Sequence, residues 1–367
     1  MTTTPVSADT PTDTPPVGTP DPTRRPERRP QATTTAFLRT ATPLLVVIVG
    51  LALFTGARNP AFLTGNNLQN ILSQVAVLGI LAAGQTFLLI GGQMDLSVGS
   101  LASLVAVLAA REFGAGWSPV AVVAVSLATG AAVGLLWGLI VAYLSVPPFI
   151  LTLGGLSVFA SLALVVSGNT PIPVPDGLSG WGFGTWLGLR APVVMVLAVM
   201  LVLGLALHFS RFGRNTYALG SSRQATYLSG VPVRRLVVAL FVLNSTLTAF
   251  GGLVLMARLG SGDPRSGSGL ELTVIAVIVL GGAALSGGRG TMAGSALGVL
   301  VFGVISASLT FLHVPGAYQS LVSGGILIVA VVITAAADLR AGRAIGIRGE
   351  NGLLATTFGS LLRRRPR

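Results

Sequence analysis

Long apolar runs with few charges limit what this chain can fold into. Residues 43–56, 120–144 and 192–208 are nearly continuous apolar stretches in which apolar and polar side chains do not alternate. A helix of about 18 or more such residues can cross a bilayer, whereas the strands of a membrane barrel alternate. The runs therefore predict membrane-spanning helices, which satisfy their backbone hydrogen bonds internally.

The composition agrees with this prediction. Of the 367 residues, 52 % are hydrophobic and 9 % are charged, and the mean hydropathy is +0.81. Soluble domains carry about 25 % charged residues, so we predict an all-α polytopic bundle in lipid. Cysteine is absent, and the two histidines, His208 and His313, are far apart in the sequence. We therefore expect no disulfide, no metal site and no histidine-based catalytic site.

We predict about ten membrane-spanning helices, which together form a permease domain over residues 37–337. The predicted ranges are 37–57, 70–91, 96–112, 119–144, 148–168, 191–210, 235–258, 271–287, 291–312 and 317–337. Residues 171–190 contain three prolines and two tryptophans and are predicted to lie at the membrane surface. Residues 1–36, rich in Thr and Pro, are predicted to be a disordered cytoplasmic tail. Residues 338–367 are predicted to be a basic cytoplasmic tail.

The arginines predict the orientation of the bundle. The net charge is +12, and all 23 basic residues are arginine. With the N-terminus inside, 18 arginines fall on inner segments and five on outer segments. Basic residues favour the cytoplasmic side, so both termini are predicted to be cytoplasmic and the number of spans even. Because the arginines flank apolar runs, we interpret them as topological signals and expect no nucleic-acid partner.

Glycine is abundant, at 48 residues, and small residues recur at i, i+4 spacing within 131–141 and 294–303. Small residues allow helix backbones to approach closely in lipid, so this spacing predicts tight packing. Two segments also show a weak internal similarity, because Gly91–Gly92 precedes Leu96–Ser97 just as Gly281–Gly282 precedes Leu285–Ser286. Internal repeats are common in transporters, but this match alone does not establish one.

Two acidic residues lie beside apolar runs. Asp95 stands in the segment GGQMDLSVGS, and a carboxylate within the membrane costs roughly 2.5–3.5 kcal/mol. We interpret Asp95 as the N-cap of the next helix, with substrate contact or other packing as alternatives. The neighbouring glycines would permit a broken helix there. Glu271 is interpreted as stabilising a helix start through the helix dipole, with a pore-lining role as the alternative.

The longest polar segment between two spans covers residues 210–235 and is predicted to be cytoplasmic. Within it, Ser222–Leu228 is predicted to form a short helix that ends at Gly230 and Pro232. A short cytoplasmic helix offers a surface that a soluble partner could bind. Residues Gly287–Gly290 resemble a phosphate-binding loop but lack the Walker lysine, so we predict a tight turn carrying Arg289.

Four motifs give the chain a family resemblance over roughly residues 60–337. They are Asp95–Ser100 preceded by Gly91–Gly92; Val146–Gly154; Phe212–Arg214 with Tyr217–Gly220, Ala225 and Ser229–Gly230; and Glu271–Leu272 with Val279–Gly282 and Gly287–Gly290. The sequence resembles the permeases of bacterial ABC importers for ribose and related monosaccharides. It departs from the usual family pattern at Gln93 and at Ser221–Ser222.

The resemblance implies a multi-pass protein of the bacterial cell membrane that transports a monosaccharide by alternating access. It implies as partners a cytoplasmic ABC ATPase, which uses ATP and Mg, an extracytoplasmic sugar-binding protein and a second permease copy, identical or different. The chain itself would need no cofactor and would not be an enzyme. The segment resembling the ATPase-coupling segment contains Tyr217, Gly220, Arg223, Ala225, Ser229 and Gly230.

Polar residues of the spans are the candidates for the translocation path or its gate. They are Gln85, Gln93, Asp95, Ser97, Asn244 and Glu271. Three rival functions remain open: a branched-chain amino acid permease of the same superfamily, an ion- or proton-coupled carrier, and a membrane-embedded enzyme. A coupled carrier would need several intramembrane carboxylates, and an enzyme would need clustered catalytic side chains.

Overall fold

The computed structural model describes residues 34–174 and 178–315, together with six single positions beyond them (Tyr318, Leu321, Gly324, Gly325, Ile328 and Val332). The first half contains α1 (Thr34–Arg58), η1 (Pro60–Leu63), α2 (Gly65–Gln74), α3 (Ala76–Ile90), α4 (Val98–Gly114), α5 (Pro119–Tyr143) and α6 (Pro148–Ser167). The second half contains α7 (Ser179–Gly182), α8 (Ala191–Phe209), α9 (Arg211–Ser221), α10 (Arg223–Leu228), α11 (Val233–Leu259), α12 (Leu270–Leu280) and α13 (Met292–Phe311). The strands are β1 (Ile172–Pro173), β2 (Thr185–Trp186), β3 (Leu189–Arg190) and β4 (Ser261–Gly262).

The predicted all-α membrane bundle is confirmed. Within the described residues, six helices are long and apolar enough to cross a bilayer, or seven if the bent pair α2–α3 counts as one span. Nine of the ten predicted ranges contain a helix, and the tenth, 317–337, lies largely outside the described residues. Helix α1 begins at Thr34, three residues before the predicted span, while the rest of the predicted N-terminal tail and all of the C-terminal tail also lie outside.

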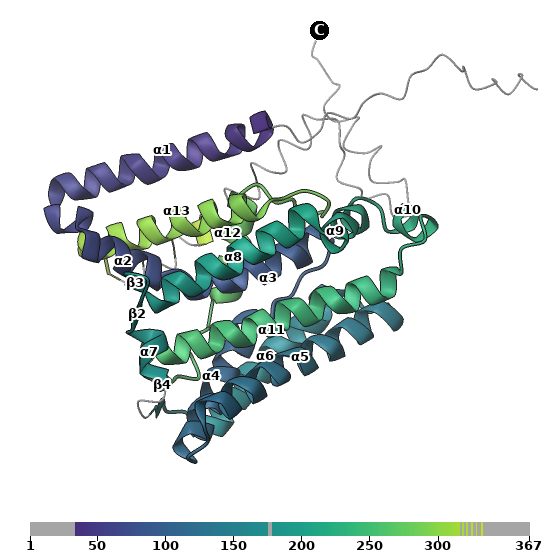
Figure 1. Ribbon diagram of the computed structural model, residues 1–367, viewed down its shortest axis with the longest axis horizontal. Coiled ribbons are helices and arrows are strands. Elements are labelled where there is room, and N and C mark those ends of the chain that lie inside the picture. Colours follow the sequence, from purple (N-terminus) through teal and green to yellow (C-terminus); the bar gives the residue numbers. More distant parts are fainter. Residues whose placement is uncertain are drawn as a thin grey trace, which may run out of the picture.

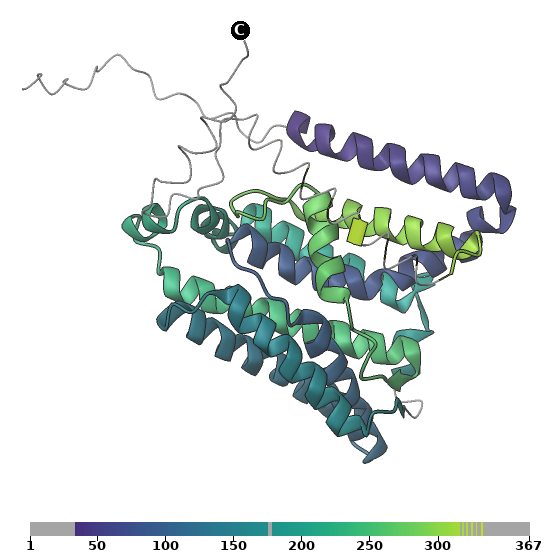
Figure 2. The same ribbon diagram turned by 180° about the vertical axis from the view of Figure 1, so that it is seen from behind.

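Three predicted spans, over 70–91, 96–112 and 271–287, do not match one continuous helix that is long and apolar enough to cross a bilayer; the 17-residue α4 in the range 96–112 is too short by this measure. The range 70–91 is bent by 44° between α2 and α3, where Val75 interrupts the helix. The prediction of a span over 271–287 is wrong, because α12 has only 11 residues and ends at Leu280. Gly281 and Gly282 end it, and the chain then turns back toward α13. Figure 2 shows α12 as a short helix steeply inclined to its neighbours.

Helix α11 lies at the centre of the molecule, between α3 and α8 on one side and α4, α5 and α6 on the other (Figure 1). Its tightest neighbour is α5, whose Gly130, Gly134 and Gly138 face it. A Cβ added at Gly134 would lie 2.5 Å from the carbonyl oxygen of Phe241 on α11. The predicted close packing at i, i+4 glycines is therefore confirmed.

Helix α1 lies at the edge of the bundle beside α13 (Figure 1). At the same end of the molecule as α7, two short antiparallel pairs, β1 with β4 and β2 with β3, connect the helices. The described part of residues 171–190 thus forms short strands and α7 between α6 and α8, and its predicted position at the membrane surface stays a prediction.

Candidate functional site

Two helices end inside the bundle in the same way. Helix α3 ends at Ile90, and the amides of Gly91, Gly92 and Gln93 donate to the carbonyls of Phe87, Leu89 and Leu88. Helix α12 ends at Leu280, and the next three amides donate to carbonyls at the same three relative positions. The second glycine of each pair has a positive φ, +70° at Gly92 and +92° at Gly282, which favours glycine. The similar segments around Gly91–Gly92 and Gly281–Gly282 therefore form the same type of helix C-terminus.

A buried polar cluster fills the gap between α3 and α4. Asp95 is fully buried, and its Oδ1 accepts hydrogen bonds from the backbone amide (2.8 Å) and hydroxyl (2.6 Å) of Ser97. Its Oδ2 accepts from Asn244 Nδ2 on α11 at 3.0 Å. Three donors therefore replace the water that a carboxylate needs. The predicted N-cap role is wrong in detail, because the N-cap of α4 is Ser97 and Asp95 holds Ser97 in place.

Further polar groups complete the cluster. Gln85 on α3 donates through Nε2 to the carbonyl oxygen of Asp95 at 3.2 Å, and Trp137 donates through Nε1 to Ser97 Oγ at 3.3 Å. Thr152 on α6 accepts from the amide of Leu96 at 3.0 Å. The break after α3 is thus fixed from four sides, by α3, α5, α6 and α11.

The cluster is not fully satisfied in this conformation. Gln85 Oε1, Asn244 Oδ1, Ser245 Oγ and Gln93 Oε1 are buried without a hydrogen-bond partner among the described residues. Buried polar atoms are usually paired, and an unpaired one calls for an explanation such as a functional role or a bound water or ion. Of the predicted path residues, Gln85, Asp95, Ser97 and Asn244 meet here, and Gln93 is half-buried at its edge.

Glu271 lies apart from the cluster, at the start of α12. Its Oε1 accepts from the amide of Gly269 at 3.2 Å, and it stands in the first turn of the helix. A Cβ added at Gly99 on α4 would contact Glu271 Oε2 and the carbonyl oxygen of Gly267. Glu271 thus occupies the expected first-turn position, where α4 and α12 meet.

The backbone at Gly92, Gly220, Gly287 and Gly288, here called the glycine junction, joins the end of α3 and the loop between α12 and α13 to α9. The amide of Gly288 donates to the carbonyl oxygen of Ile90, the last residue of α3, at 2.8 Å. A Cβ added at Gly220, near the end of α9, would overlap Ile90 O and Gly288 N. One added at Gly287 would lie 2.8 Å from the Cα of Gly92. At Gly92, Gly220 and Gly287 the three segments therefore touch through backbone atoms.

The predicted coupling segment forms α9 and α10 and leads into α11. The short helix predicted at Ser222–Leu228 is confirmed as α10, with Ser222 as N-cap and Gly230 at φ +80° after its end. Tyr217 is half-buried and its hydroxyl donates to the carbonyl oxygen of Gly290 at 2.7 Å. Burial raises the pKa of Tyr217. Arg223, Ala225, Ser229 and Gly230 are exposed.

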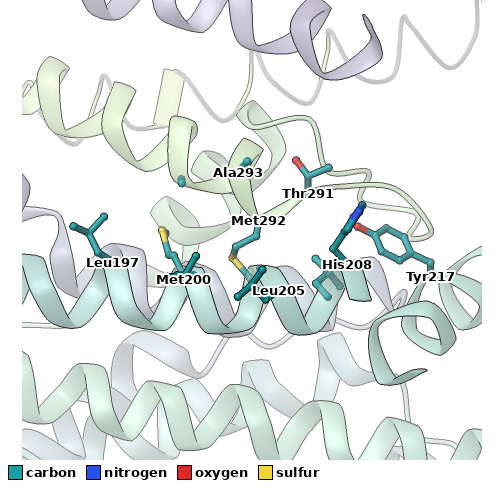
Figure 3. A pocket seen from close by; sticks show the side chains of 12 residues that line it. Leu197, Met200, Leu205, His208, Tyr217, Thr291, Met292 and Ala293 are labelled. Atoms are coloured by element: carbon teal, nitrogen blue, oxygen red, sulfur yellow. The ribbon is translucent and has the colours of Figure 1, made fainter. Parts of the chain in front are cut away.

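A mostly apolar cavity of about 450 Å³ lies beside the glycine junction, between α8 and α13. Figure 3 shows Leu197, Met200 and Leu205 along α8, with His208 and Tyr217 at one end. Binding sites orient polar ligands with a few well-placed polar groups, and this lining has few along most of its length. The cavity does not bring together the predicted path residues.

Sequence reasoning missed several contributors to the site. Thr152 lies in the motif Val146–Gly154, for which no individual roles were predicted, and no role was predicted for Trp137. Gly287 and Gly288 were interpreted as a turn and as part of the fourth motif, without a predicted contact to residues 210–235. The signals were a threonine and a tryptophan inside apolar runs and a glycine pair repeating an earlier one.

Discontinuous helices around buried polar groups, inside an apolar multi-pass bundle, are typical of membrane transport proteins. Residues 67–331 match the family model described as the permease component of the branched-chain amino acid transport system. The chain belongs to this family of transport permeases and is a multi-pass protein of the bacterial inner membrane.

The chain is also similar to individual permeases. It is 37 % identical to the ribose import permease protein of Bacillus subtilis, covering 79 % of this chain and 89 % of the relative. It is 36 % identical to the L-arabinose ABC transporter permease protein of Azospirillum brasilense, over 78 % of this chain and 86 % of the relative. It is 33 % identical to a xylose transport system permease protein of Haemophilus influenzae, over 79 % and 94 %. No solved structure matches the chain significantly.

Proposed function

We propose that this chain is the membrane-spanning subunit of an ATP-binding-cassette importer for a monosaccharide. The relatives named above transport ribose, L-arabinose and xylose, and the chain covers 86 % or more of each of their lengths. All three sugars are pentoses, so pentoses are the first substrates to test.

The energy for transport is supplied by a partner protein. The sequence has no Walker A motif, since its Gly287–Gly290 segment lacks the lysine and hydroxyl residue that bind phosphate and Mg²⁺. We propose a cytoplasmic ATPase that binds and hydrolyses MgATP, an extracytoplasmic sugar-binding protein and a second permease copy. These partners follow from the family to which the chain belongs, and the chain itself is proposed to be a transport subunit without enzymatic activity.

The contact of Gly220 with the end of α3 and with the loop between α12 and α13 is the observation that carries the proposed mechanism. Helix α10 is exposed and offers a surface that an ATPase can bind, and α9 precedes α10 directly in the chain. At the end of α9, Gly220 contacts Ile90 and Gly288 with no side chain between them. A displacement of α10 would therefore reach the end of α3 and the loop between α12 and α13 without being absorbed by flexible side chains.

The ends of α3 and α12 are the elements that would move between the two conformations of the transporter. Because α3 and α12 end within the bundle, each can tilt without bending a continuous helix. The partly unsatisfied cluster around Asp95 has polar groups available for new partners in a second conformation. ATP binding and the sugar-loaded binding protein would each favour one of the two conformations, and only such a difference in affinity can shift an equilibrium.

Reconstitution tests the function. The chain is co-reconstituted in proteoliposomes with the ATPase and the sugar-binding protein encoded beside its gene, and uptake of radiolabelled ribose, L-arabinose, xylose and leucine is measured with and without ATP. We expect ATP-dependent uptake of at least one pentose and none of leucine. Uptake of leucine alone would establish the amino acid permease that the family description also allows. Uptake driven by an ion gradient without ATP would refute the proposal.

A further inference from the structure

A basic cavity lies at one end of the bundle, beside α10. It has a volume of about 690 Å³ and is lined by Arg223, Arg234, Arg235, Tyr143 and Tyr227, among others. Tyr143 is the last residue of α5, and α11 begins at Val233. The cavity therefore lies where α5 ends, α11 begins and α10 extends from the bundle. Figure 1 shows α10 beyond the N-terminal end of α11.

The three arginines have no acidic partner in the part of the chain that the structure describes. Its four acidic residues are Asp95, Glu112, Asp263 and Glu271. Asp95 is buried in the polar cluster, Glu112 and Asp263 lie at the C-terminal ends of α4 and α11, and Glu271 packs against Gly99 in the first turn of α4. The positive charge of the cavity is thus not neutralised by the described chain, and an anion from outside can neutralise it.

The geometry favours a phosphate group as this anion. The Arg234 guanidinium lies over the Tyr143 ring, 5.2 Å from its centroid, which restricts its orientation. Planar guanidinium groups bind phosphate oxygens in a two-pronged manner that a point charge cannot match. A volume of about 690 Å³ is in the range of ligand cavities.

The surroundings favour a lipid as the source of the phosphate. Leu144 is 70 % exposed and directly follows Tyr143, which lines the cavity at the end of α5. Tyrosine favours the headgroup level of a membrane, and basic pockets between helix ends bind anionic headgroups. We propose that this cavity binds the headgroup of an anionic phospholipid. This inference does not depend on the transported substrate, only on the chain spanning a membrane.

Native mass spectrometry of the purified full chain tests the proposal. The chain is equilibrated in detergent with phosphatidylglycerol or phosphatidylcholine, with and without millimolar inorganic phosphate, and retained lipid is measured. We expect preferential retention of phosphatidylglycerol that phosphate does not abolish. Replacing one arginine by glutamine should weaken retention about fivefold, and replacing all three on the order of 100-fold. Arg211→Gln is the matched control, because Arg211 is exposed on α9 but does not line the cavity.

Three results would overturn the proposal. Equal retention of the two lipids by the wild-type chain, a comparison that needs no variant, removes the preference for an anionic headgroup. Complete displacement of the lipid by phosphate identifies a site for a free anion. Unchanged lipid retention by the triple variant, combined with loss of ATPase binding, assigns the arginines to the partner protein. If the triple variant does not fold, the three single variants give the same test.

Discussion

Replacing Gly220 by alanine tests the proposed path from α10 to the helix breaks. The added Cβ overlaps the carbonyl oxygen of Ile90 and the amide nitrogen of Gly288, which are themselves hydrogen-bonded at 2.8 Å. Both atoms belong to the backbone, so a side-chain rotation cannot relieve the overlap. Either the bond between them breaks or α9 moves away from the junction.

The cost can be estimated from these two effects. Overpacking of a core costs about 1–3 kcal/mol, and a buried donor or acceptor left unpaired costs about 1–3 kcal/mol. Alanine recovers up to about 1 kcal/mol because glycine is unfavourable within a helix. The net destabilisation expected for Gly220→Ala is therefore about 1–5 kcal/mol, or less if α9 shifts as a unit.

The assay separates stability from coupling. Thermal unfolding of the purified chain is measured beside sugar uptake and ATPase activity of the reconstituted transporter. We expect a lower unfolding temperature, together with a larger loss of uptake than of ATP hydrolysis. Gly154→Ala is the control, because a Cβ at this helical glycine meets nothing within 4 Å. If Gly220→Ala matches this control in stability and in uptake per ATP, the proposed path is refuted.

Two further predictions concern single side chains of the site. Asp95→Ala leaves the donors of Ser97 and Asn244 without their acceptor and should lower the free energy of unfolding by about 3 kcal/mol or more. Asp95→Asn keeps one side-chain oxygen and should lower it less. Equal unfolding temperatures for both variants and the wild type would contradict this account. Tyr217→Phe removes the 2.7 Å bond to Gly290 and should cost about 1 kcal/mol. Because burial raises the pKa of Tyr217 above its usual value near 10, its neutral form is favoured in the folded state, so this residue should contribute no pH dependence near neutrality and should lower stability as the pH rises above about 10. A wild-type decline in that range that persists unchanged in Tyr217→Phe would show that other groups cause it.

The membrane bundle could be predicted from the sequence because hydrocarbon imposes simple rules on a chain. An apolar run must become a helix to satisfy its amides, and arginines predict which helix ends lie inside. The short helix α10 was predictable because Ser222 and Gly230 are local signals for its two ends. The family motifs are equally local, which is why the resemblance is visible in the sequence alone.

The site itself depended on contacts between distant residues. Asp95 and Asn244 are 149 residues apart, and Thr152 and Trp137 come from two further helices. No local pattern states that Asp95 is held by these groups and is not the N-cap of α4. Likewise, hydropathy did not distinguish an 11-residue helix from a full span at α12, because buried and lipid-facing helices are equally apolar.

The apolar runs alone thus determined that this is a helical membrane protein, because an apolar run in lipid forms a helix to satisfy its backbone hydrogen bonds. Where those helices break, and what they touch at the breaks, was decided only by tertiary structure. The glycines of the junction illustrate the difference. Glycine in the sequence permits many conformations, and only the packing of α9 against Ile90 and Gly288 shows that Gly220 is needed because three backbones meet there.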